Sequence, residues 1–250
     1  MKSILKTVSV LLFWLAVWLL LSFLVGSLLL PRPDQVLLHL GALVITADFW
    51  RAVAATLLRI LCGTVIGTVL GVALAALTCR FRLVNALFSP LLTVVKSTPV
   101  ASFIVLLLIW VGRDVLPAVI VVLMVLPVVW ANVSAGISGT DRQLLELAEV
   151  YRFSRSRTLK RIFLPSVLPH FLAALRSALG MAWKAGVAAE VLTVPGVSVG
   201  KRLMDAKLYL EIPDLFAWTL VVILCSLAIE KLLIAAVSRL GSTRKGGAAQ

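Results

Sequence analysis

The 250-residue chain is 61% hydrophobic, whereas soluble domains are about 45–50% apolar, and its mean hydropathy is +1.09. Only 14% of its residues are charged, yet its formal net charge is +13. This composition excludes a soluble globular domain and predicts an all-α integral membrane protein. The sequence contains no extended basic patch interleaved with aromatic residues, so the basic excess indicates loops at a lipid surface and not a nucleic-acid partner.

Cysteine and histidine usage argues against a metal centre or a disulfide framework. Cys62, Cys79 and Cys225 are odd in number and lie in or beside apolar stretches, where they resemble small core residues. His39 and His170 are isolated and lack the spacing of metal ligands. The sequence therefore predicts no metal site and no bound cofactor.

Six apolar stretches are long enough to cross a membrane, which takes about 20 helical residues. They are expected at about 8–30, 51–78, 91–111, 115–135, 167–192 and 215–237. The first is longer than the core of a signal peptide, about 7–15 residues, and is interpreted as a retained span. Pro99 is expected to bend or break the entry to the third, and residues 35–50 are expected to lie along the outer surface. Residues 1–250 are thus interpreted as a single transmembrane domain.

The distribution of basic residues predicts the orientation. Six spans place both termini on one side of the membrane, and the segments on that side contain thirteen Lys or Arg residues against six on the other. Cytoplasmic loops are enriched in Lys and Arg. Both termini and the loop at about 137–166 are therefore expected in the cytoplasm.

The second span carries glycines at every fourth position. Gly63, Gly67 and Gly71 lie on one helix face, and such a face allows a second helix to approach closely. We interpret this pattern as helix packing and not as a ligand site. Arg59, in the same span, is expected to face the protein interior or to extend toward the surface.

The longest polar stretch, Asp141–Pro169, contains six Lys or Arg residues and is too basic for hydrocarbon. Glu146, Leu147, Val150 and Phe153 are spaced as one side of a short helix. The chain contains no phosphate-binding G-x-x-x-x-G-K-[ST] motif, no nucleophile elbow and no catalytic carboxylate pair. A transporter of this composition would need a separate energy source, and a helix exposing apolar residues could bind it.

This stretch resembles the EAA loop of ABC-importer permeases, whose pattern is Glu-Ala-Ala, three residues, Gly, nine residues, Ile, one residue, Leu-Pro. The match, without a gap, places Glu146, Ala148, Ile162, Leu164 and Pro165 at the corresponding positions. Two positions differ, because Leu147 replaces the first Ala and Arg152 replaces the Gly at the turn between two short helices. A non-Gly residue avoids positive φ, but the register of the Leu-Pro ending predicts that the two-helix shape is kept.

The resemblance extends from Arg51 to Glu190 and is closest to permeases of nitrate, sulfonate, taurine and related solutes. It implies the six-helix type I permease fold in a bacterial inner membrane. It also implies a second permease copy, an external solute-binding protein, and ATPase subunits that use ATP and Mg. The residues it assigns to ATPase coupling are Glu146, Leu147, Ala148, Val150, Arg152, Phe153, Ile162, Leu164 and Pro165, with Glu146 anchoring the loop by a salt bridge or a helix cap.

Polar residues at membrane depth are candidates for a translocation path. Lys96, Ser97 and Thr98 precede the broken third span, and Lys184 and Glu190 lie in the fifth. Each has an alternative role: packing or surface contact for Lys96, a buried ion pair for Lys184, and anchoring of the following loop for Glu190. Lys184 is expected to face a water-filled cavity or a dimer axis, and lysines in the path would suit an anionic solute.

Two other functional classes remain as alternatives. A secondary carrier or channel would transport without an ATPase, and many carriers contain inverted repeats, of which we find none. A membrane-embedded enzyme would need convergent catalytic groups, which the motifs do not provide.

Overall fold

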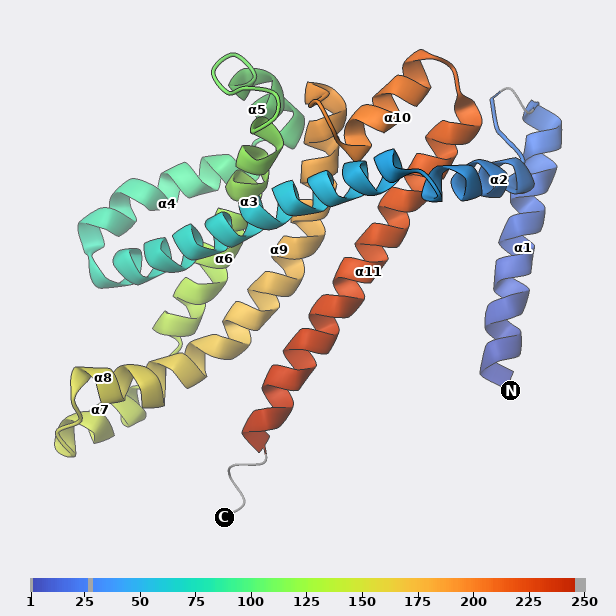
Figure 1. The fold of residues 1–250 in the computed structure, drawn as a ribbon. Helices are drawn as coiled ribbons and strands as arrows, with labels where there is room; N and C mark the ends of the chain where they lie inside the picture. The colour runs from blue at the N-terminus through green and yellow to red at the C-terminus, as the bar shows by residue number, and fades with distance from the viewer. Residues whose placement is uncertain (1, 27–28, 246–250) are drawn as a thin grey trace.

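The computed structural model describes residues 2–26 and 29–245, with the side chains of 6–26, 29–232 and 235. Throughout this part of the chain the regular structure is helical (Figure 1). The helices are α1 (Lys2–Val25), α2 (Pro33–Val44), α3 (Ala47–Arg80), α4 (Arg82–Ser97), α5 (Val100–Leu107), α6 (Leu116–Ser138), α7 (Arg142–Val150), α8 (Arg155–Thr158), the π-helical turn η1 (Leu159–Phe163), α9 (Leu164–Thr193), α10 (Val199–Leu208) and α11 (Ile212–Lys245).

The core lies between α3, α6 and α9, and the glycine face of α3 packs closely against α6. A Cβ atom added at Gly63 would lie 2.7 Å from the Ala118 carbonyl oxygen, and one at Gly71 would lie 2.9 Å from that of Leu126. At Gly67 the added atom would lie 3.0 Å from Val125 Cβ. The helix-packing interpretation of the three glycines is confirmed, because larger side chains would push α6 away.

The third span is broken more deeply than predicted. Helices α4 and α5 together are apolar enough to cross a membrane, but they are bent by 104° at Thr98 and Pro99. The expected break at Pro99 is present, but it divides the predicted stretch 91–111 between two helices, of which α4 begins at Arg82 and α5 ends at Leu107. The physical reason is that proline disfavours the helical conformation of the residue before it and cannot donate a backbone hydrogen bond.

The other five spans are present as long apolar helices, with different ends. Helix α1 stops at Val25, not near residue 30, and the expected surface segment at 35–50 contains α2 and the start of α3. The helix of the fifth span begins earlier, since α8, η1 and α9 form one run from Arg155 to Thr193. Pro165 and Pro169 lie within this run instead of interrupting it. The adjacent π-helical turn is the kind of local adjustment that lets a helix continue through proline.

The start of α1, the end of α11 and the predicted coupling loop lie at the same end of the molecule. In Figure 1 the start of α1, the end of α11 and the α7–α8 segment lie at the bottom, while α10 and the start of α11 lie at the top. This agrees with an even number of membrane crossings. Which end faces the cytoplasm stays a prediction based on the basic residues.

Candidate functional site

The predicted coupling loop contains two short helices separated by a tight turn. Helix α7 ends in a Schellman motif, in which Phe153 N–H donates to the Ala148 carbonyl at 2.8 Å and Arg152 N–H donates to that of Glu149 at 3.0 Å. Arg152 occupies the left-handed position of this motif with φ of 48°. The two-helix shape is therefore confirmed. Arg152 stands where the backbone favours glycine, at a cost of roughly 1–2 kcal/mol.

Small and apolar residues of the loop pack inward to hold this shape. Ala148 and Ile162 are buried, at 5% and 7% exposure. The Arg157 guanidinium lies 5.3 Å from the centre of the Phe153 ring, and the Asp141 carboxylate caps α7 by accepting from Gln143 N–H at 2.8 Å. The loop is thus held in shape by contacts within the chain.

Several large apolar side chains of the loop point outward. Leu147, Val150 and Tyr151 are 53%, 78% and 68% exposed, and Leu144 and Leu164 are also exposed. The first three are spaced along one side of α7 and its C-terminal turn. Exposed apolar residues beside basic ones on a short polar helix are typical of an interaction surface.

Glu146 is exposed, and among the described residues its carboxylate makes no hydrogen bond or ion pair with another residue of this chain. The cap of α7 is provided by Asp141. The anchoring role that the resemblance implies for Glu146 stays a prediction.

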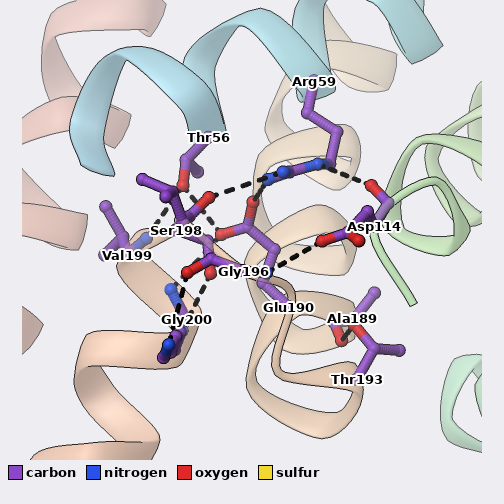
Figure 2. A network of polar contacts seen from close by, with 12 residues as sticks. Thr56, Arg59, Asp114, Ala189, Glu190, Thr193, Gly196, Ser198, Val199 and Gly200 are labelled. Atoms are coloured by element: carbon purple, nitrogen blue, oxygen red, sulfur yellow. Dashed lines mark hydrogen bonds and ion pairs between the residues drawn. The ribbon is translucent and has the colours of Figure 1, made fainter. Parts of the chain in front are cut away.

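At the opposite end of the long helix, Glu190 is fully buried within a network of polar contacts (Figure 2). Its carboxylate forms an ion pair with the Arg59 guanidinium of α3 and accepts from Thr56 Oγ1 at 2.8 Å and from Gly200 N–H at 3.3 Å. Thr56 Oγ1 in turn accepts from Val199 N–H at 2.9 Å. Helices α3, α9 and α10 are thus joined through one carboxylate.

The loop between α9 and α10 is held by the same residues. Arg59 Nε donates to the Asp114 carbonyl at 2.9 Å, and Gly196 N–H donates to Asp114 Oδ1 at 2.8 Å (Figure 2). A Cβ atom at Gly200 would overlap Glu190, so the backbone of α10 can lie this close to Glu190 only because residue 200 is glycine. This geometry favours the anchoring alternative for Glu190 over a position on an open path.

Sequence reasoning did not pair Arg59 with Glu190, which are 131 residues apart. The available signal was that each is a lone charge of opposite sign in an apolar span, and buried charges are paired. Register along the two spans would have placed both near the outer membrane surface.

Lys184 lines a cavity of about 540 Å³ between α9 and α11, as predicted for a cavity-facing residue. Arg176 and Glu230 line the same cavity. Glu230, which lies within the predicted sixth span, contributes an acidic side chain to the same lining as Lys184. No ion pair within 4 Å joins these three residues in the described part of the chain.

The other predicted path residues lie at the break between α4 and α5. Ser97 Oγ and Thr98 Oγ1 both donate to the Val94 carbonyl, at 3.1 and 2.8 Å. Lys96 Nζ lies 5.9 Å from the centre of the Trp130 ring of α6. The two hydroxyls are thus satisfied locally, and the exposed Lys96 makes a cation–π contact.

Comparison with known proteins gives a consistent set of relatives. The model of the family described as "Binding-protein-dependent transport system inner membrane component" matches residues 67–242. A probable ABC transporter permease protein of Brucella melitensis is 29% identical, over 89% of this chain and 90% of that protein. A putative aliphatic sulfonates transport permease protein of Bacillus subtilis is 26% identical, over 81% of this chain and 74% of that one. Permeases named for bicarbonate, taurine and nitrate also match, in agreement with the predicted subfamily.

Among solved structures, one described as an amino acid ABC transporter with histidines superposes with a TM-score of 0.66. It covers 80% of this chain and 98% of that one, at 16% sequence identity. At this identity the likeness supports the fold alone. The arrangement of five long apolar helices, or six spans with the bent α4–α5 pair, thus agrees with the fold of that structure.

Proposed function

This chain belongs to the family of binding-protein-dependent transport system inner membrane components, and we propose that it forms the solute path of an ATP-driven ABC importer. In this proposal ATP and Mg are bound by a separate ATPase, and an external solute-binding protein delivers the solute. The relatives named for sulfonates, taurine, nitrate and bicarbonate support a small anion as the solute.

The observation that carries the proposal is the exposed apolar surface of α7 and its turn. Leu147, Val150 and Tyr151 are more than half exposed on a segment whose own fold is already fixed by the Schellman motif. Such a surface suits insertion into a groove of a partner. Glu146, exposed beside it and unpaired among the described residues, would add a charged contact with the ATPase.

Two copies of the chain are needed in this proposal, because a path between subunits requires a second wall. Helix α1 is consistent with this, since only 6% of its most apolar window is buried and it stands apart from α3, α6 and α9 (Figure 1). Lipid would cover whatever part of this surface a second copy leaves open.

Cross-linking from α7 tests the docking surface. Val150→Cys, in a chain whose three native cysteines are replaced by alanine, should cross-link to the co-expressed ATPase. Leu208→Cys is the matched control, since Leu208 is 68% exposed at the opposite end of the molecule and should cross-link to an external protein only. The assignment of α7 fails if the two positions give the same products.

Charge reversal tests Glu146 separately. Glu146→Lys should reduce co-purification of the ATPase and uncouple transport, while the thermal stability of the permease stays unchanged because the side chain is exposed. Glu149→Lys, also exposed on α7, is the matched control. A secondary carrier, the remaining alternative, would transport in proteoliposomes without ATP and without either effect.

A further inference from the structure

The cavity between α9 and α11 combines two basic side chains with one acidic side chain. Arg176 and Lys184 come from α9, Glu230 and the half-buried Ser226 come from α11, and Trp183 forms part of the wall. All three charged residues are exposed in the single chain. Unpaired charges facing lipid at this depth are costly, so we expect the cavity to hold water.

One hydrogen bond fixes the register of the two helices. Trp183 Nε1 donates to the Val222 carbonyl at 3.1 Å, and α9 and α11 run side by side in opposite directions (Figure 1). Glu230 lies eight residues beyond Val222, and Arg176 lies seven residues before Trp183. At about 1.5 Å per residue both are displaced by roughly 11–12 Å toward the same end.

Arg176 and Glu230 therefore face the cavity at nearly the same level. Lys184 lies about 12 Å away along α9, eight residues from Arg176. The acidic side chain is thus opposite the nearer basic one, and the two charges compensate through space although they are not in contact. Lys184 remains as the uncompensated charge.

We propose that Glu230 determines the charge of the solute that this cavity accepts. By offsetting Arg176, Glu230 leaves the cavity with one net positive charge, which matches a monovalent anion and disfavours a divalent one. Its substitution by a neutral residue would raise the net charge to two and favour divalent anions. The proposal rests on the proposed function, because it gives the transported solute a charge class.

The cavity can be probed without transport. Ser226→Cys is introduced into the full chain, with Cys62, Cys79 and the adjacent Cys225 replaced by alanine, and the protein is placed in lipid nanodiscs. The rate of modification is measured with a sulfonate-bearing and a trimethylammonium-bearing methanethiosulfonate. Neither measurement needs an ATPase or a binding protein.

We expect the anionic reagent to react roughly a hundredfold faster than the cationic one, relative to their rates with a small thiol. One unit charge about 12 Å away at an effective dielectric of about 20 raises the local concentration of a monovalent anion roughly tenfold and lowers that of a monovalent cation by the same factor. Lys184→Met should remove this preference, and Glu230→Gln should increase it by roughly another hundredfold. Glu211→Gln, an exposed acidic residue of the α10–α11 connection, is the matched control and should leave it unchanged.

Protection experiments then distinguish solute charge. Methanesulfonate should protect the thiol introduced by Ser226→Cys at lower concentration than sulfate at equal ionic strength, and Glu230→Gln should improve protection by sulfate roughly tenfold more than it improves protection by methanesulfonate. Equal preferences in Glu230→Gln and its parent would overturn the proposal. Absence of reaction with both reagents would also overturn it, because the cavity would then not contain water. If the rates behave as expected but the complex transports without ATP, the proposed function fails while the charge assignment stands.

Discussion

Replacing Arg59 by methionine should destabilise the fold much more than replacing Glu190 by glutamine. The Glu190 side chain is 0% exposed, so loss of its cationic partner leaves a buried carboxylate without compensation. Removing one member of a buried ion pair typically costs about 3–5 kcal/mol. Thr56 and Gly200 would still donate to the carboxylate, but neither carries a charge.

The reverse substitution should be milder because the remaining groups keep partners. Glutamine has nearly the volume of glutamate, and its carbonyl can still accept from Thr56. Arg59 is 16% exposed and donates to the carbonyls of Asp114 and Val197 as well. With about 1 kcal/mol for each weakened hydrogen bond, Glu190→Gln should cost roughly 1–2 kcal/mol.

Equilibrium unfolding in mixed SDS micelles would give these free energies in a double-mutant cycle. The double variant should cost at least about 2 kcal/mol less than the sum of the single ones, since interacting residues are non-additive. Arg51→Met is the matched control on the same helix, because Arg51 is 74% exposed and its contact with Asp48 should contribute less than about 1 kcal/mol. Additive costs, or equal effects at Arg59 and Arg51, would refute the reasoning.

Three further outcomes follow from the packing and the loop. Gly67→Leu should lower the folded yield and cost about 1–3 kcal/mol or more, as overpacking does, whereas Gly41→Leu should be tolerated because a Cβ atom added there meets no atom within 4 Å. Arg152→Gly should raise the free energy of local unfolding of the loop by about 1 kcal/mol, because glycine adopts the positive φ of this turn without strain. Hydrogen exchange in α7 should then be slower, and faster exchange would contradict the assigned turn. Leu147→Asp should leave the thermal midpoint unchanged but reduce ATPase co-purification, and retained binding would argue against the α7 surface.

Periodicity predicted the helices well because membrane spans follow simple length and polarity limits. The glycine repeat of α3 also identified the face on which this helix packs, since two helices can approach closely only where the residues between them are small. The third span was harder to predict, because the number of apolar residues in a stretch does not indicate whether its helix is bent. Pro99 indicated a break, yet its angle of 104° depends on how α4 and α5 pack against α6.

The candidate sites were less predictable because they depend on pairs of residues far apart in the chain. The loop could be found from its spacing, since all its members lie within 20 residues of Glu146. Arg59 and Glu190 could be flagged as charges in the membrane, but only the crossing of α3 and α9 brings them together. Placing Glu230 beside the basic residues of α9 requires the register of α9 against α11, which the hydrogen bond from Trp183 fixes.

The long helical run from Arg155 to Thr193 joins the two sites mechanically. Its first turns belong to the loop that we propose as the ATPase dock, and Glu190 near its other end is bound to α3 and α10. A helix of 39 residues spans about 58 Å, so a displacement of one end is transmitted over the full thickness of a membrane. The fixed network at Glu190 would then act as the pivot, and the loop, about 52 Å away along the run, would move most, whereas Lys184, about 9 Å from the pivot, would move little. If so, loosening the pivot should reduce coupling between ATP hydrolysis and transport without changing ATPase binding, which Glu190→Gln tests in the reconstituted complex. Unchanged coupling in that variant would separate the network from transport and leave it a purely stabilising contact.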